Sequence, residues 1–497
     1  MKAARRFLHL RDPLILFLGT LAVVASVAGE QRTVTRLDAS RISPAEIDST
    51  VTQLMKAAEV PGLGLAILND GKIVYLKGYG LRDKEKGLPM TVDTAMYAAS
   101  FTKVAFGYMV MQLVDQGVLD PDKPVYEYLP KALPEYPNYA DLASDDRYKK
   151  ITARMLLDHT SGFPNWRAFE DDRKLKIHFE PGSRFAYSGE GLALLQLVVE
   201  TITKKPLEEL MRQLVFQPLG MKRTSMVWQA RFDHDYANGY DEYGQSLGPD
   251  KRKNADAAGS MTTTVSDFAH FVEAVMQGKN LRPKTYAEIL SPQIRITSKH
   301  EFPPFENVDT HDNDAIRLSY GLTWGLYWSP YGEALFKEGH ADGWRNYTVS
   351  FAKPKAGIVI MTNSGTGEGI YNDLLETLLK DTFTPIEWEG FTPYNRLPPR
   401  PPLPVHKAVV VDPQILQKYV GRYGNPPDLV LAVRRSGDHL SIQENDEPVQ
   451  ELLAENDTTF FSTTADDVFT FESDAAGRVI KMVLHTGGKD IPLSRIQ

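Results

Sequence analysis

The spacing of hydrophobic positions changes along the chain, and each change predicts a different element. In residues 60–82, two apolar runs, GLGLAIL and KIVYLKGYG, flank Asn69-Asp70-Gly71. This pattern predicts a β-hairpin, because the turn residues tolerate positive φ. Residues 100–116 (SFTKVAFGYMVMQLVDQ) are apolar on nearly every helical face, and Gly117 is placed to end a helix. We therefore expect a helix buried in the centre of a domain.

Helical and strand-like segments then follow one another in blocks. We expect helices at 152–158, 189–203, 206–215, 265–277 and 283–289, and strands at 323–328, 345–351 and 358–363. Together with the hairpin, strands stand at both ends of this region and helices lie between them. This order predicts an α+β fold, in which one antiparallel sheet built from both ends of the region is flanked by helices.

The C-terminal part has a different character. Residues 391–406 (FTPYNRLPPRPPLPVH) are dense in proline, which is typical of a stiff linker. A short helix near 414–419 and the alternating segments LVLAV, HLSIQ, DVFTF and RVIKMVL follow, separated by turns. Short strands at even spacing predict a small antiparallel β-barrel module at 407–497. The linker would join it to a main domain at 29–390.

The N-terminus has the layout of a secretory signal peptide. The basic residues Lys2, Arg5, Arg6 and Arg11 precede an apolar run from Leu14 to Ala28 that ends in small residues. The alternative is a membrane anchor, but the run is short of the ~20 apolar residues that span a bilayer. We expect residues 1–28 to be removed, leaving a secreted or periplasmic protein with no stable membrane span.

Composition excludes several classes of function. The 497 residues carry a formal net charge of −8 and no basic stripe, which argues against a nucleic-acid partner. There is no cysteine, so disulfides, a cysteine nucleophile and thiolate metal sites are absent from the chain. The oligomeric state does not follow from these numbers.

Ser100 and Lys103 stand one helical turn apart at the start of the expected central helix. Residues i and i+3 share a helix face, so the lysine can reach the serine oxygen. Burial in an apolar wall disfavours the charged amine and lowers its pKa toward a value useful for a base. A second S-x-x-K, Ser350 to Lys353, lies in a strand pattern, where i and i+3 point to opposite faces. The first copy predicts a serine hydrolase or acyl transferase.

Two further segments are candidates for the same chemistry. Tyr187 precedes an expected helix, and its hydroxyl could relay a proton to a leaving group; alone, such a tyrosine is more often a packing residue. The segment 339–343 (GHADG) precedes an expected strand, and its small residues would let a backbone N–H approach a substrate. With the Ser100 N–H this would form an oxyanion hole; the alternative is an ordinary turn.

These fragments stand in a familiar order. MYAASFTKVAFGYMVMQLVDQGVLD, ITARMLLDHTSGFPNW, FAYSGEGLALLQLVVE and AGSMTTTVSDFAHFV, within residues 46–381, resemble the serine β-lactamase and penicillin-binding-protein-like superfamily. The similarity is to the class C-like branch, which includes D-alanyl-D-alanine carboxypeptidases, D-aminopeptidases and esterases. The resemblance implies a β-lactamase-type sheet with a helical lobe and a catalytic groove at their boundary. The C-terminal module resembles the lipocalin-like domains appended to many members.

The resemblance also implies roles for individual residues. It makes Ser100 the acylated nucleophile, Lys103 its base partner, Tyr187 the first residue of a Y-x-N element and His340 the first residue of a K/H-x-G element. Two substrate-binding positions depart from the pattern. Gly189 stands where many relatives have Asn, and Asp342 stands where glycine usually follows.

These departures leave two questions open at the level of sequence. Asp342 could pair with Lys337 or Arg345, or face a cationic group of the substrate. Gly343 or Trp344 could complete the oxyanion hole.

The sequence as a whole predicts an exported serine hydrolase that works through an acyl-enzyme on Ser100. Its expected substrate is a small molecule or short peptide with an ester or a D-amino-acid amide bond, and no metal or organic cofactor is required. The alternatives are a non-catalytic penicillin-binding-like ligand-binding protein or a β-lactamase. An acidic cluster at 309–314 could bind a hard cation, but a solvated loop is favoured. His159 and Ser161 look like a catalytic pair, but the resemblance makes their turn structural.

Overall fold

The computed structural model describes residues 33–496, except 304, 306–307, 401, 403–405, 426–428, 445–448, 464–466 and 487–488. The expected signal peptide at 1–28 lies outside these residues. Among the helices that are described, none combines the length and the apolarity that crossing a bilayer requires.

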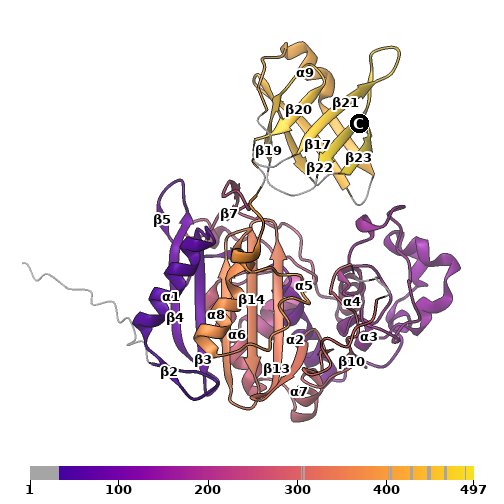
Figure 1. Cartoon of the computed structure of the whole chain (residues 1–497). Coiled ribbons are helices and arrows are strands. Elements are labelled where there is room, and N and C mark those ends of the chain that lie inside the picture. The colour runs from indigo at the N-terminus through magenta and orange to yellow at the C-terminus, as the bar shows by residue number, and fades with distance from the viewer. Residues whose placement is uncertain are drawn as a thin grey trace, which may run out of the picture. The chain divides into compact units, whose positions relative to one another are not determined.

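A nine-stranded antiparallel sheet forms the centre of the main domain (Figure 1), with the strand order β10-β11-β12-β13-β14-β15-β3-β4-β5. Its N-terminal strands are β3 (Gly62–Asn69), β4 (Lys72–Asp83) and β5 (Leu88–Pro89). Its later strands are β10 (Ile294–Arg295), β11 (Ser319–Tyr320), β12 (Gly325–Ser329), β13 (Gly332–Ala341), β14 (Trp344–Phe351) and β15 (Ala356–Thr362). β15 pairs with β3, so segments from both ends of the domain share one sheet, as the sequence predicted.

Helices cover both faces of this sheet. Leu63, Leu65 and Ile67 of β3 pack in one core with α1 (Pro44–Ala57) and α8 (Tyr371–Leu379). The alternate residues Ala66 and Leu68 belong to a second core with α2 (Phe101–Asp115) and α6 (Val265–Gln277). This alternation follows from the two-residue period of a strand. It leaves α2 buried along almost its whole length, as its uniformly apolar sequence requires.

A helical lobe lies in the chain between α2 and α6. It contains α3 (Ala153–Leu157), α4 (Gly189–Thr203), α5 (Leu207–Met211) and several 3₁₀ turns, and α7 (Pro283–Ile289) follows α6. The helix expected at 206–215 changes to a π-helical turn over Arg212–Phe216. The Gln112 side chain of α2 donates to the Leu214 carbonyl at 3.0 Å, which supplies a partner to a carbonyl where the helical bonding pattern changes. Short strand pairs complete the domain: β1 (Val34–Thr35) with β2 (Arg41–Ile42), β6 (Met96–Tyr97) with β9 (Thr262–Thr263), and β7 (Gly239–Tyr240) with β8 (Ser246–Gly248).

One sequence expectation about the site changes here. The segment 339–343 is not a loop before a strand, because Gly339, His340 and Ala341 complete β13. Only Asp342 and Gly343 turn the chain into β14, and Gly343 has a φ of 73°. The strand is hard to see in the sequence, because Lys337 and Glu338 interrupt its apolar pattern although both are buried.

The C-terminal part forms an eight-stranded antiparallel sheet in sequence order. After α9 (Pro413–Tyr419) come β16 (Gly421–Asn425), β17 (Leu429–Ser436), β18 (His439–Glu444), β19 (Gln450–Ala454), β20 (Thr459–Ser462), β21 (Val468–Ser473), β22 (Val479–Thr486) and β23 (Lys489–Ser494). Tyr423 of β16 bridges to Arg495, so the first and last strands meet and the sheet is a nearly closed barrel. Leu440, Phe460, Met482 and Leu493 fill its core. The predicted fold class, an α+β domain plus a small β-barrel, is confirmed.

Candidate active site

Ser100 and Lys103 meet at the N-terminal end of α2. The Lys103 Nζ lies 3.0 Å from the Ser100 Oγ and donates a second hydrogen bond to the Ala258 carbonyl at 2.6 Å. Lys103 is only 1% exposed. Burial, followed by the positive charge of Lys337, lowers the pKa of this amine to about 7. A substantial neutral fraction is therefore present near neutral pH, as a base for the serine requires.

The backbone before the nucleophile is held in a sparsely populated conformation. Ala99 has a φ of 46°, a left-handed value that costs a residue with a side chain of order 1 kcal/mol or more. Thr102 stabilises this backbone conformation. Its hydroxyl donates to the Ala99 carbonyl at 2.6 Å and accepts from the Met261 N–H at 3.0 Å. This conformation places Ser100 at the N-cap position of α2.

Tyr187 lies between the two lysines. Its hydroxyl accepts a hydrogen bond from the Lys337 Nζ at 3.0 Å, and the Lys103 Nζ lies 4.9 Å from the centre of its ring. Burial raises the pKa of the Tyr187 phenol well above its usual range, and the charge of Glu338 adds to this, while a hydrogen bond with Ser100 acts in the opposite direction. The resting group is therefore a protonated phenol.

His159 supports Tyr187. The imidazole is fully buried and packs on the Tyr187 ring with centroids 4.5 Å apart, and its Nδ1 accepts from the Ser188 N–H at 3.3 Å. Burial holds the pKa of His159 well below its usual range, so it is neutral. The Ser161 Oγ accepts from the Phe163 N–H at 3.3 Å. The structure places both residues in a turn that orients Tyr187, which agrees with a structural role.

The lysine beside Tyr187 is a residue that sequence reasoning did not assign to the site. Lys337 of β13 is fully buried and forms an ion pair with Glu338. His340, which the resemblance placed in the catalytic group, lies farther along the same strand with its side chain 47% exposed and its Nδ1 3.2 Å from Glu368 Oε2. Along a strand, positions 337 and 340 point to opposite faces. The buried cation that contacts the phenol is Lys337.

Gly189 has no side-chain amide, but the side chain of Asn165 supplies one close to it. The Gly189 N–H donates to the Asn165 side-chain oxygen at 3.1 Å, and Asn165 lines the same cavity as Ser100. Gly189 itself does not line that cavity, because Trp166 covers it: a Cβ added there would lie 2.7 Å from the indole. With the Asn165 oxygen engaged, its NH₂ group is the donor available to a substrate.

The turn after β13 also differs from expectation. Gly343 packs against the backbone of Tyr240, and the Trp344 ring packs on Tyr97 with centroids 6.4 Å apart. Of this segment, His340 and Ala341 line the Ser100 cavity, whereas Gly343 and Trp344 do not. The end of β13, rather than the turn itself, therefore borders the nucleophile.

Asp342 forms neither of the two ion pairs that the sequence left open for it, with Lys337 or with Arg345. Lys337 pairs with Glu338, the Arg345 Nε pairs with Glu368 at 2.5 Å, and Asp342 is exposed. The acidic loop at 309–314 is likewise solvated and internally paired: the Asp314 carboxylate contacts His311 at 2.8 Å and Arg295 at 3.2 Å.

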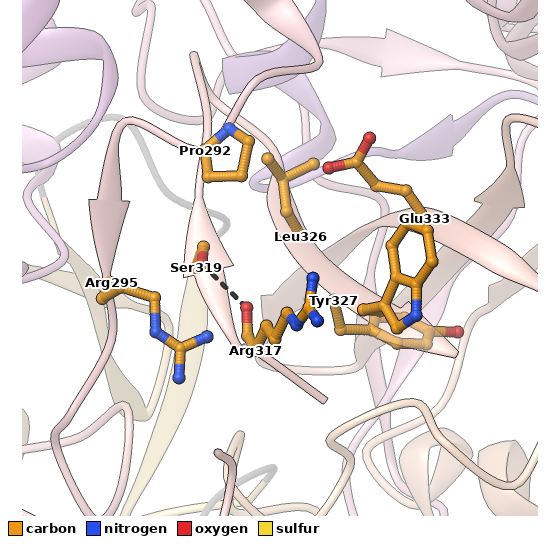
Figure 2. Close-up of a pocket in the computed structure, with 8 residues that line it drawn as sticks. Pro292, Arg295, Arg317, Ser319, Leu326, Tyr327 and Glu333 are labelled. Carbon is orange, nitrogen blue, oxygen red and sulfur yellow. Dashed lines mark hydrogen bonds between the residues drawn. The ribbon is translucent and has the colours of Figure 1, made fainter. Parts of the chain in front are cut away.

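The cavity around Ser100 has a volume of about 770 Å³. Aromatic residues line part of it, among them Trp166, Phe302 and Phe391, and Phe169 at its edge is 76% exposed. A second cavity of about 360 Å³, shown in Figure 2, is bordered by strands β10 to β13 and shares no lining residue with the first. In it the Ser319 hydroxyl donates to the Arg317 carbonyl at 2.8 Å, and none of the residues predicted for catalysis contributes to its lining.

The sheet with helices on both faces, together with a cavity lined by a serine, a lysine and a tyrosine, defines a protein of the β-lactamase fold. A family model described as "Beta-lactamase" matches residues 47–379, and the chain belongs to that family. A second model, described as "Domain of unknown function (DUF3471)", matches residues 405–495.

Curated relatives and solved structures agree with this assignment. Esterase EstB of Burkholderia gladioli is 32% identical over 217 residues, which cover 38% of this chain and 53% of that protein. Protein flp of Staphylococcus aureus (strain MRSA252) is 23% identical over 339 residues, which cover 65% of this chain and 63% of that protein. The chain thus spans less than two thirds of these relatives.

Two solved structures show the same fold. The octameric penicillin-binding protein homologue from Pyrococcus abyssi has a TM-score of 0.55 at 20% identity, covering 91% of this chain and all of that one (100%). D-alanine carboxypeptidase AmpC from Burkholderia cenocepacia has a TM-score of 0.52 at 21% identity, covering 65% of this chain and 95% of that one.

Proposed function

We propose that this protein is an exported hydrolase that forms an acyl-enzyme on Ser100 and cleaves esters or D-amino-acid amide and peptide bonds. The observation that carries the proposal is the 3.0 Å contact between the Ser100 Oγ and a buried Lys103 amine whose pKa is about 7. A serine beside a neutral amine in a cavity is an activated nucleophile.

In the acylation step, Ser100 attacks the substrate carbonyl and Lys103 takes the serine proton. One N–H of the neutral amine donates to the Ala258 carbonyl, and the nitrogen lone pair accepts the serine proton. The Ser100 N–H, together with a backbone N–H at the end of β13, would hold the developing oxyanion. Tyr187 passes a proton to the leaving group, and Lys337 stabilises negative charge on the phenol during the transfer.

In the second step, water attacks the acyl-enzyme. The same proton path, run in reverse, deprotonates the water and returns a proton to Ser100, as microscopic reversibility requires. Ser100, Lys103 and Tyr187, which carry the proton transfers, all line the cavity.

Two observations support this substrate class. A relative with 32% identity is named an esterase, and a structure with the same fold is named a D-alanine carboxypeptidase. The Asn165 NH₂ group lines the cavity and could donate a hydrogen bond to a substrate amide. We therefore keep both ester and amide substrates.

Labelling with a fluorophosphonate probe tests the nucleophile. The wild-type protein is expected to be labelled, and Ser100→Ala is expected to remain unlabelled. Parallel assays with p-nitrophenyl esters, D-Ala-D-Ala peptides and nitrocefin then separate esterase, peptidase and β-lactamase. An unlabelled wild type would favour the non-catalytic binding protein.

The proposed export has a separate test. N-terminal sequencing of secreted material should give a sequence that begins near Gly29, and an intact Met1 in a membrane fraction would contradict export with cleavage.

Lys337→Met should lower kcat/KM for a p-nitrophenyl ester by about 10²-fold, because the phenol loses the cation that stabilises its anion. His340→Ala should cost less than about tenfold, since a half-exposed ion pair contributes about 1 kcal/mol or less. Lys337→Arg should restore part of the loss, which a purely structural defect would not. If His340→Ala proved the more damaging change, the histidine would hold the role that the resemblance implied.

A further inference from the structure

Three buried carboxylates converge beside the nucleophile. Glu301 follows β10 in the chain, Glu338 lies on β13 and Glu389 follows α8, and each contributes a carboxylate oxygen within 4.8 Å of the others. They are 3%, 7% and 6% exposed. All three line the cavity that contains Ser100. Within the described part of the chain, this is the only such convergence of three or more acidic or histidine ligands.

Three carboxyl groups in this cluster share one ion-paired cation, Lys337. Lys337 pairs with Glu338 but also donates to Tyr187, and Lys103 is engaged by Ser100 and Ala258. The Glu389 Oε2 accepts from the Tyr347 hydroxyl at 2.6 Å, but its buried Oε1 has no hydrogen-bond partner. A buried carboxylate oxygen without a partner is costly. Burial and the charge of Glu338 raise the pKa of both Glu301 and Glu389 well above the usual range.

We propose that Glu301, Glu338 and Glu389 bind the protonated primary amine of the substrate. This inference rests on the proposed function and names its substrate class: esters or amides that carry an ammonium group near the reacting carbonyl. An R–NH₃⁺ group has three donors. Donor–acceptor distances of about 2.9 Å in tetrahedral directions place the three acceptors about 4.7 Å apart, and the carboxylate oxygens lie within 4.8 Å of one another.

The surroundings favour an organic ammonium over a metal ion. The Lys337 ammonium already contacts the cluster and would repel a divalent cation more strongly than a single positive charge. Phe302 and Phe391 line the cavity with the carboxylates, and aromatic faces suit the carbon chain of an alkylammonium. A hard cation such as Ca²⁺ takes 6–8 oxygen ligands. The cluster offers three, one oxygen from each glutamate.

The cluster is also linked to the reacting atoms. A chain of polar contacts runs from Glu338 through Lys337 to Tyr187, and Tyr187 hydrogen-bonds with Ser100. The amine and the carbonyl of one small substrate can therefore occupy the cavity together. A bound cationic substrate would neutralise the cluster. The carboxylates would then no longer contribute to the raised pKa of the Tyr187 phenol.

Calorimetric titration with n-butylammonium chloride tests the site without turnover, using the Ser100→Ala protein. Butylammonium should bind at least about tenfold more tightly than the neutral isostere 1-butanol, a discrimination that a charge-assisted hydrogen bond readily supplies. Glu301→Gln and Glu389→Gln should each remove most of this difference. Glu333→Gln should not, because Glu333 is a carboxylate of the same strand β13 that lines the second cavity (Figure 2).

A kinetic readout complements the binding experiment. The ratio of kcat/KM for D-alanine p-nitroanilide to that for its N-acetyl derivative should fall at least about tenfold in Glu301→Gln. Thermal melts control for folding, and removing a buried carboxylate from this crowded cluster should leave Tm unchanged or raised.

Three outcomes would overturn the inference. Equal binding of butylammonium and 1-butanol would mean that the cluster is a structural group whose carboxyl groups share protons. Tight binding of Ca²⁺, Mn²⁺ or Zn²⁺ that depends on Glu301 and Glu389, with no butylammonium binding, would make it a metal site. Butylammonium binding that survives both glutamine substitutions would place the amine elsewhere. If the wild type lacks fluorophosphonate labelling while Ser100→Ala still binds butylammonium, the hydrolase proposal fails and the amine site stands.

Discussion

Ser100→Ala should lower kcat/KM for p-nitrophenyl butyrate by at least about 10⁴-fold, because removing a nucleophile abolishes the covalent route and leaves only binding and oxyanion stabilisation. Steady-state hydrolysis followed at 400 nm, the absorbance of released p-nitrophenolate, measures the loss. The expected fall is in kcat rather than KM, since the missing oxygen acts in the reacting step.

The chain offers a matched control in its second S-x-x-K. Ser350 is buried on β14, whereas Lys353 is exposed, so this pair cannot form the same contact. Ser350→Ala should leave kcat/KM within about twofold of wild type. If Ser100→Ala and Ser350→Ala lost activity equally, the loss would reflect impaired folding rather than removal of the nucleophile. Full activity in Ser100→Ala would overturn the proposed mechanism.

Lys103→Met should lower kcat/KM by about 10³-fold, within the usual range for a lost general base. In the wild type, the protonated amine cannot accept the serine proton. Since the pKa of Lys103 is about 7, kcat/KM should rise about tenfold per pH unit below that value and level off above it. The rate rises with pH because the neutral amine, which is the active base, predominates above the pKa of Lys103.

The pH profile separates catalysis from packing. Lys103→Met should lose the rise through neutral pH, and its Tm should not fall, because a partly charged buried amine is replaced by an apolar side chain of similar length. Lys353→Met, which alters an exposed lysine, should preserve both the rate and the profile. A wild-type profile that is flat from about pH 5 to about pH 9 would contradict the assignment of Lys103 as the base.

Much of the fold was accessible from sequence because its signals are local. The hairpin at 60–82 and the helices at 189–203, 265–277 and 283–289 follow from turn residues and hydrophobic period, and the structure has them within one or two residues. The Ser100–Lys103 contact is equally local, since the helical repeat alone brings the two residues together. Strand β13 was not predicted, because its charged residues Lys337 and Glu338 are buried by tertiary contacts that no local pattern records.

The sequence by itself determined the order of elements, the spacing of Ser100 and Lys103 and the likeness that brought Tyr187 to attention. Only the tertiary structure decided which cation reaches Tyr187, that Asn165 stands where Gly189 lacks an amide, and that three glutamates share one cavity with the nucleophile. The physical reason is distance along the chain. Burial, desolvation and charge coupling arise only when separate segments pack together. In the sequence, a buried Lys337 or Glu389 cannot be distinguished from a charged residue on the surface.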